Sequence, residues 1–152
     1  MLKNANYALF VNFMLGDLKN ERTHLLFYTT AASTVCGPHR EEFKELFEKE
    51  AQGELQHVIQ FQNAILGLGV DLTEAEEVYT NYPYVISTNL KELMTFAHKM
   101  ESDVVKNYSA RISDNLGLLD DPDRRWMEIF YEEQIKKSRE DVDNYKMILK
   151  GL

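Results

Sequence analysis

Four long stretches of the sequence repeat apolar residues at steps of three and four, and this pattern constrains the fold more than any other feature. The stretches cover residues 6–35, 39–66, 89–115 and 122–149. Steps of three and four return a side chain to the same face of an α-helix, so each stretch predicts a long amphipathic helix. The chain has only 7 glycines and 3 prolines, and most of them lie between these stretches, where they can end one helix and begin the next.

The connections between the predicted helices are short, long and short. Gly37–Pro38 separates the first two helices, and Asp121 and Pro122 are expected at the N-cap and first position of the fourth. Residues 67–88 show no sustained helical periodicity and form the long connection. Short turns make antiparallel neighbours, whereas a crossover of about 20 residues can return the chain along a bundle. The sequence therefore predicts an all-α four-helix bundle, with residues 1–152 as a single domain.

The composition is that of a globular protein with an acidic surface. Hydrophobic residues make up 44% of the 152 residues and charged ones 28%. The net charge of −8 argues against nucleic-acid binding driven by overall charge and against attachment to an anionic membrane. No apolar run approaches the length of about 18–20 residues that spans a bilayer, and the N-terminus lacks a clean signal-peptide core. Cys36 is the only cysteine, which excludes an intrachain disulfide and favours the cytoplasm over secretion.

Side chains that can bind metal interrupt the apolar stripes near the middle of each predicted helix. Glu54 and His57 lie three residues apart, so they project from one face of the second helix, and that face is otherwise apolar. An unpaired ionised carboxylate in a core costs several kcal/mol, so a group of them requires protonation or bound cations. The candidates on the four helices are Glu21, then Glu54 and His57, then Glu101, then Gln134 with Glu133 beside it.

Charge balance indicates two divalent cations. Two such ions bring four positive charges, the glutamates of the first three helices return three negative ones, and Glu133 or Glu50 could supply the fourth. Oxygen ligands with one imidazole suit Fe(II), Mn(II) or Zn(II), whereas copper and iron–sulfur sites favour thiolates. The phase of the fourth helix is ambiguous by one residue, which leaves Gln134 and Glu133 as alternative ligands.

Matches to one known family occur on all four predicted helices. They are Glu21 with Tyr28 seven residues later, Glu54-x-x-His57, Met100–Glu101, and Glu133-Gln134-Ile135-Lys136. In these residues the chain resembles the ferritin and bacterioferritin group of di-iron carboxylate proteins. The third-helix match resembles the bridging glutamate, and the fourth resembles animal-type ferritins, whose glutamine lies at the second iron. The resemblance implies a ferritin-like four-helix bundle with a long crossover between its second and third helices.

The resemblance also implies a function. A protein of this group is a ferroxidase, which oxidises Fe(II) with O2 or peroxide at two iron ions and stores or releases Fe(III). In this interpretation Gln134 orients the oxidant or a water, and Tyr28 donates an electron or a hydrogen bond. Such proteins assemble, so a homo-oligomer is implied.

The resemblance assigns the ligands as well. Glu54 and either Glu101 or Glu21 would bridge or clamp the two irons. His57 would bind the first iron. These assignments come from the family and not from the spacing of the residues.

Three departures from the family pattern qualify these expectations. Lys137 follows Gln134 by three residues and Lys136 follows Glu133 by three, so the fourth helix lacks a second Glu-x-x-His. Leu55 stands where bacterioferritins place a haem-ligating methionine, so haem is not expected. The sequence ends 18 residues after Gln134, so we expect no fifth helix, and a standard large cage is in doubt.

Two other functions fit the same residues. One is a di-iron oxidase or peroxidase that stores no mineral. The other is a non-catalytic helical bundle that acts through interactions and has a degenerate metal site, which Lys136 and Lys137 would favour.

Several individual residues also have plainer interpretations. Glu21 and Glu101 could lie at stripe edges in ion pairs, Gln134 could be hydrogen-bonded within the core, and Tyr28 could be a core aromatic residue. Glu50 is expected at the stripe edge or in solvent. Three histidines are expected at surface or cap positions and are therefore not nominated as ligands: His24, His39 and His98.

Overall fold

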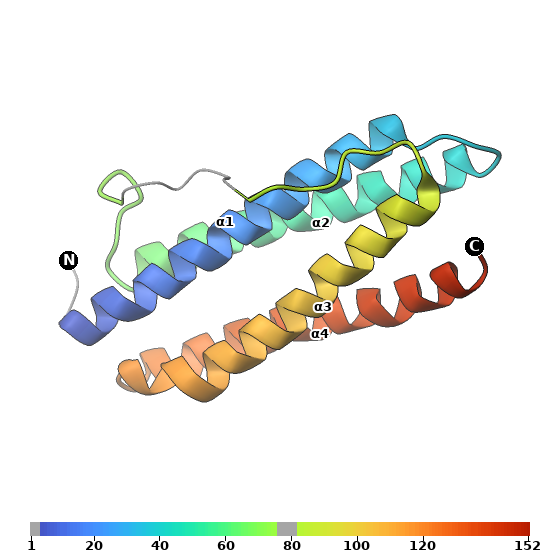
Figure 1. The fold of residues 1–152 in the computed structure, drawn as a ribbon. Helices are drawn as coiled ribbons and strands as arrows, with labels where there is room; N and C mark the ends of the chain where they lie inside the picture. Colours follow the sequence, from blue (N-terminus) through green and yellow to red (C-terminus); the bar gives the residue numbers. More distant parts are fainter. Residues whose placement is uncertain (1–3, 76–81) are drawn as a thin grey trace. The chain divides into compact units, whose positions relative to one another are not determined.

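Helices dominate the computed structural model, which describes residues 4–75 and 82–152. Those residues form four α-helices, which begin and end within one residue of the bounds predicted from periodicity, and one single-turn 3-10 helix (Figure 1). None of the helices in the described part is long and apolar enough to cross a membrane. The elements are α1 (Ala5–Thr34), α2 (Arg40–Gly67), α3 (Leu90–Asn115), η1 (Leu116–Leu118) and α4 (Asp123–Lys150). They belong to two compact units, Met1–Thr88 and Asn89–Leu152.

The first unit contains α1 and α2, which lie side by side and antiparallel (Figure 1). The ring centroids of Phe27 on α1 and Phe47 on α2 are 6.4 Å apart, and Glu21 Oε2 lies 3.5 Å from His57 Nδ1. An earlier residue of α1 thus meets a later residue of α2, as in an antiparallel pair. Gly37 adopts a φ of 112° in the turn between the helices, a backbone conformation that suits glycine. This turn confirms the short antiparallel connection expected from the sequence.

Hydrogen bonds close both ends of α1. At its start, the Asn4 side chain accepts the backbone N–H of Tyr7 at 3.1 Å, which caps the helix. At its end, the guanidinium of Arg40, the first residue of α2, donates to the carbonyl oxygens of Ser33 and Val35. Arg40 thereby satisfies carbonyls that the helix leaves without an internal partner and holds the turn closed.

The long connection after α2 returns to the end of α1. The backbone N–H of Cys36 donates to the carbonyl of Thr88 at 3.0 Å, and the Thr34 hydroxyl donates to the carbonyl of Ser87 at 2.7 Å. Since α2 is antiparallel to α1, it finishes at the opposite end of the pair, so the connection begins at one end of the two helices and finishes at the other (Figure 1). The long crossover expected between the second and third helices is therefore confirmed.

The second unit contains α3 and α4, which are also antiparallel. The rings of Tyr108 and Tyr131 lie 5.2 Å apart, and Ser102, earlier in α3, lines the same groove as Arg139, later in α4. The Asn89 side chain caps α3 by accepting the backbone N–H of Glu92 at 3.0 Å.

The start of α4 differs from the prediction. Pro122, expected at the first helical position, occupies the cap position instead, and α4 begins at Asp123 without a side-chain cap. The Pro122 carbonyl accepts the N–H of Trp126 at 3.1 Å. The Arg124 guanidinium donates to the Leu119 carbonyl at 2.7 and 3.0 Å, so this arginine, and not an aspartate cap, holds the preceding turn.

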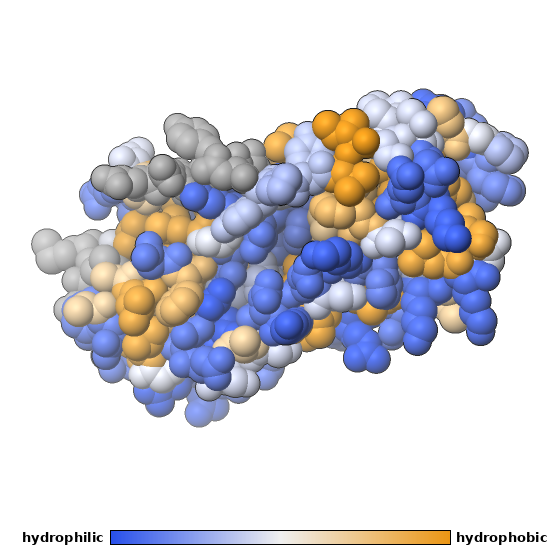
Figure 2. All heavy atoms as spheres, in the orientation of Figure 1, coloured by the Kyte–Doolittle hydropathy of each residue, from blue (hydrophilic) through white to orange (hydrophobic). Residues whose placement is uncertain are grey.

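Aromatic and aliphatic side chains of the predicted stripes form the buried core. On the face drawn in Figure 2, hydrophobic side chains form separate patches among hydrophilic ones. The fully buried stripe residues include Phe10, Met14, Leu18, Tyr28, Phe47, Phe61, Met94, Ala97 and Tyr131. Several charged residues at stripe positions are buried with them, and these define the candidate site.

Candidate metal centre

The buried face of α1 carries a run of polar residues one turn apart. At the centre of the run, Glu21 is only 2% exposed. Spacings of four, three and four place the four side chains on one face of the helix. In order they are Asp17, Glu21, His24 and Tyr28, and all four are buried.

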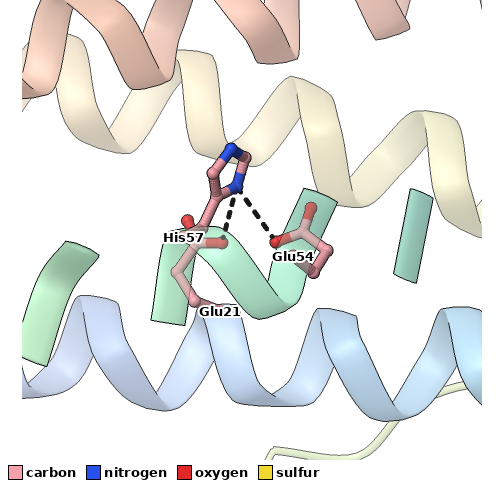
Figure 3. A group of neighbouring side chains, drawn as sticks. All are labelled: Glu21, Glu54 and His57. Carbon is pink, nitrogen blue, oxygen red and sulfur yellow. Dashed lines mark hydrogen bonds and ion pairs between the residues drawn. The ribbon is translucent and has the colours of Figure 1, made fainter. Parts of the chain in front are cut away.

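α2 presents Glu54 and His57 to Glu21. Glu54 is 3% exposed, and the His57 side chain is 15% exposed. One ring nitrogen of His57, Nδ1, lies 3.3 Å from Glu54 Oε2 and 3.5 Å from Glu21 Oε2. Figure 3 shows both carboxylates directed at this nitrogen, with the other ring nitrogen pointing away from them. The structure therefore brings together three of the residues nominated from the sequence.

The spacing of these donors fits a metal ion. The ligand atoms of Glu21, Glu54 and His57 all lie within 4.8 Å of one another. Oxygen and nitrogen ligands about 2.0–2.2 Å from one metal are separated from each other by about 3.0–3.6 Å. The two separations measured from His57 Nδ1, 3.3 and 3.5 Å, fall in this range. Carboxylates with an imidazole are also the donor set that Fe(II), Mn(II) or Zn(II) accepts.

Glu21 is held as a carboxylate. Burial by itself would raise its pKa, but hydrogen bonds with Glu54 and His57 and the charges of His24 and His57 outweigh burial and lower the pKa from 4.5 to about 2. Ionised Glu21 therefore offers a negative charge that a bound cation would neutralise.

His24 belongs to this cluster, and the expectation that it lies at the surface is wrong. Its side chain is buried, and Nδ1 lies 4.0 Å from Glu21 Oε2. The signal in the sequence is a second Glu-x-x-His, formed by Glu21 and His24 on the first helix. Steps of three and four from Glu21 reach both His24 and the apolar Leu25, and the apolar residue is only partly buried whereas the histidine is buried.

Glu50 lies one turn before Glu54 on α2 and is also buried, contrary to its expected place at the stripe edge or in solvent. Phe47 and Ala51, its neighbours on the helix, are buried as well, so the inward face of α2 is wider than a single stripe. Tyr28 is fully buried, and its ring lies 5.2 Å from that of Phe27 and 6.3 Å from that of Phe47.

The candidates in the second unit divide by burial. Glu101 on α3 and Gln134 on α4 are buried, at 1% and 4% exposed, whereas Glu133 is exposed. The buried face of α4 therefore contains Gln134 and not Glu133. Lys137 binds Asp141 on its own helix at 3.0 Å, and Lys136 is exposed.

A family model described as the ferritin-like domain matches residues 16–147. That span includes all four helices over most of their length. The chain belongs to the ferritin-like domain family. The resemblance inferred from the sequence is therefore confirmed. A comparison with curated proteins found no match.

Solved structures with the ferritin-like fold cover nearly the whole chain. A ferritin-like di-iron carboxylate protein of Bacillus anthracis has a TM-score of 0.83 at 19% identity, covering 96% of this chain and 99% of that one. A Dps protein of Bacillus brevis has a TM-score of 0.81 at 14% identity, with coverages of 97% and 99%. A dodecameric thioferritin of Bacteroides fragilis, described as bacterioferritin-related, has a TM-score of 0.73 at 16% identity, with coverages of 95% and 86%. These similarities confirm the all-α ferritin-like fold.

Proposed function

We propose that this ferritin-like protein binds two iron ions and oxidises Fe(II) with O2 or peroxide. The observation that carries the proposal is the convergence of Glu21, Glu54 and His57, with His57 Nδ1 3.3 and 3.5 Å from the two carboxylates. Family membership and the di-iron carboxylate protein among the similar structures support an iron-related function in general. Fe(II) is the substrate in this proposal.

We assign the first iron to the α1–α2 pair. Glu21 and His57 would bind it, and Glu54 would bridge it to the second ion. On α3 we propose Glu101 as a further iron ligand, an assignment that its burial supports. Gln134, also buried, would orient the oxidant or a water from α4, and the exposed Glu133 is the less suitable candidate there.

The proposed reaction balances as two one-electron oxidations. Two Fe(II) ions each lose one electron, and O2 takes up both electrons and two protons to form H2O2. When the oxidant is peroxide, the two electrons break its O–O bond, and two protons complete two water molecules. The chain would contribute ionised Glu21, whose pKa is lowered to about 2, as a cation ligand, and Tyr28, buried on α1, as a hydrogen-bond donor or electron source.

We further propose a single ferritin-like domain over residues 1–152 and assembly into a homo-oligomer that works in the cytoplasm. One family model spanning residues 16–147 supports the single domain. The dodecameric thioferritin supports assembly. Whether Fe(III) is stored as mineral depends on whether the assembly encloses a cavity.

The interpretation as a degenerate, non-catalytic bundle loses its main support. That interpretation relied on Lys136 and Lys137 placing positive charge at the second metal. The ammonium of Lys137 is instead paired with Asp141 at 3.0 Å, and Lys136 is exposed.

Aerobic Fe(II) oxidation followed by near-ultraviolet absorbance tests the proposal. We expect wild-type protein to form Fe(III) rapidly and Glu54→Ala to fall to the rate of iron in buffer. Glu45→Ala, which alters an exposed carboxylate on the same helix, is the matched control and should behave as wild type. Equal rates for wild type and Glu54→Ala would refute the proposal. Light scattering then decides storage, because a dimer encloses no cavity.

A further inference from the structure

Two Glu-x-x-His motifs face each other across the α1–α2 pair. One is Glu21 with His24, and the other is Glu54 with His57. The helices are antiparallel, and Glu21 meets His57 at 3.5 Å. His24 lies three residues after Glu21 on α1, and Glu54 lies three residues before His57 on α2, so His24 faces Glu54. A ring nitrogen of His24 and a carboxylate oxygen of Glu54 lie within 4.8 Å of each other.

Each carboxylate consequently lies close to both imidazoles. Glu21 Oε2 is 3.5 Å from His57 Nδ1 and 4.0 Å from His24 Nδ1. Glu54 Oε2 is 3.3 Å from His57 Nδ1, and Glu54 also approaches His24. A single helix pair thus supplies two carboxylates and two imidazoles that lie close together.

We propose that His24 is the imidazole ligand of the second metal ion, with Glu54 bridging the His24 side and the His57 side of the site. The inference rests on the two-iron function proposed above. A carboxylate has two oxygens, and ions in two-metal sites lie about 3.5–4 Å apart, which one carboxylate can span. The side chain of His24 is buried and only 8% exposed, so it is enclosed with the carboxylates and not directed at solvent.

The proposal accounts for the composition of α4. That helix carries Gln134 on its buried face and has Lys137 three residues later, so it offers no Glu-x-x-His. If α1 supplies the second histidine, α4 does not need one. Each metal then has one nitrogen ligand, which strengthens binding of late first-row divalent ions relative to a site made of oxygen alone.

The alternative is that His24 only forms an ion pair with Glu21, one turn away on the same helix. The two roles predict different metal stoichiometries. If His24 only positions Glu21, a variant without it still binds two ions per chain, both less tightly. If His24 is a ligand, the variant loses one specific ion. Loss of a group that only orients a ligand weakens affinity by about 10–100-fold, so loss of the ligand itself should cost at least about 100-fold at the second site.

Anaerobic titration with Co(II) measures this stoichiometry without any catalytic turnover. Metal-free wild type, His24→Gln and His39→Gln are titrated, and bound Co(II) is counted by native mass spectrometry and calorimetry. His39, whose side chain is 60% exposed in the turn before α2, is the matched control. We expect wild type and His39→Gln to bind two ions. We expect His24→Gln to bind one ion, with the affinity of the first site little changed.

A second measurement on the wild-type protein keeps the proposal testable if His24→Gln folds poorly. Co(II) shifts the imidazole N–H signals of its histidine ligands far outside the normal proton range. One such signal should appear with the first equivalent of Co(II) and another with the second. A single shifted histidine at saturation would overturn the proposal.

The outcomes separate the two proposals. If wild type binds no Co(II) and oxidises no Fe(II), the two-iron function itself fails. If wild type oxidises Fe(II) and His24→Gln still binds two ions with wild-type affinity, the function stands and the role of His24 is wrong. A wild type that binds one ion also overturns the role of His24.

Discussion

Glu21 should make the stability of the metal-free protein depend on pH in a defined direction. Its pKa falls from 4.5 to about 2 in the folded protein because hydrogen bonds with Glu54 and His57 and the charges of His24 and His57 outweigh the effect of burial. The folded state therefore holds the ionised form more firmly than the unfolded chain does. Glu21 stabilises the fold fully above pH 4.5, and that contribution is lost as the pH falls towards 2.

The magnitude follows from the size of the shift. Each pKa unit corresponds to about 1.4 kcal/mol, so lowering the pKa from 4.5 to about 2 corresponds to about 3 kcal/mol. In Glu21→Gln this position no longer ionises, and the variant should lack this part of the pH dependence. The free energy of unfolding of wild type should therefore fall more steeply with decreasing pH than that of the variant.

Urea unfolding monitored by circular dichroism measures the difference. Both proteins are unfolded in the presence of a chelator at several pH values between 7 and 3. Glu132→Gln, which changes an exposed carboxylate on α4, is the control and should follow wild type. If Glu21→Gln and wild type lose stability in parallel across this range, the assignment of Glu21 as a strongly stabilised carboxylate is refuted.

Three further outcomes are expected. Phe47 is fully buried, with its ring 6.4 Å from that of Phe27, so Phe47→Ala should lower the free energy of unfolding by about 3–5 kcal/mol; an unchanged urea midpoint would contradict this. Asn89→Ala removes the cap that accepts the Glu92 N–H and should cost about 1 kcal/mol, whereas Asn89→Asp should retain most of the stability. Metal ligands must be deprotonated, so metal binding should release protons, and calorimetry in buffers of different ionisation enthalpy should give different heats; equal heats would contradict proton release.

The positions of the helices were predictable because they depend on local periodicity. An apolar residue every three or four positions marks an inward face, and this signal predicts that Glu21, Glu54 and His57 lie on inward stripes. The caps were less predictable. The start of α4 has no side-chain cap, and Arg124 instead donates to the Leu119 carbonyl five residues earlier, a contact that periodicity does not reveal.

The edges of each inward face were not predictable from one helix alone. His24 and Glu50 lie beside the stripe, where burial depends on how closely the neighbouring helix packs and on its register. The choice between Gln134 and Glu133 was open for the same reason, since a shift of one residue turns a side chain by about 100° around the helix. Only the folded structure puts Gln134 inside and Glu133 outside.

The amino-acid sequence by itself determined that the chain forms four long helices and that acidic residues and a histidine lie on their apolar faces, because both properties repeat with the helical period. The tertiary structure decided which of these groups meet. It brought Glu21 to His57 and His24 to Glu54, since the antiparallel register of two packed helices is set by contacts along their whole length and not by any one motif.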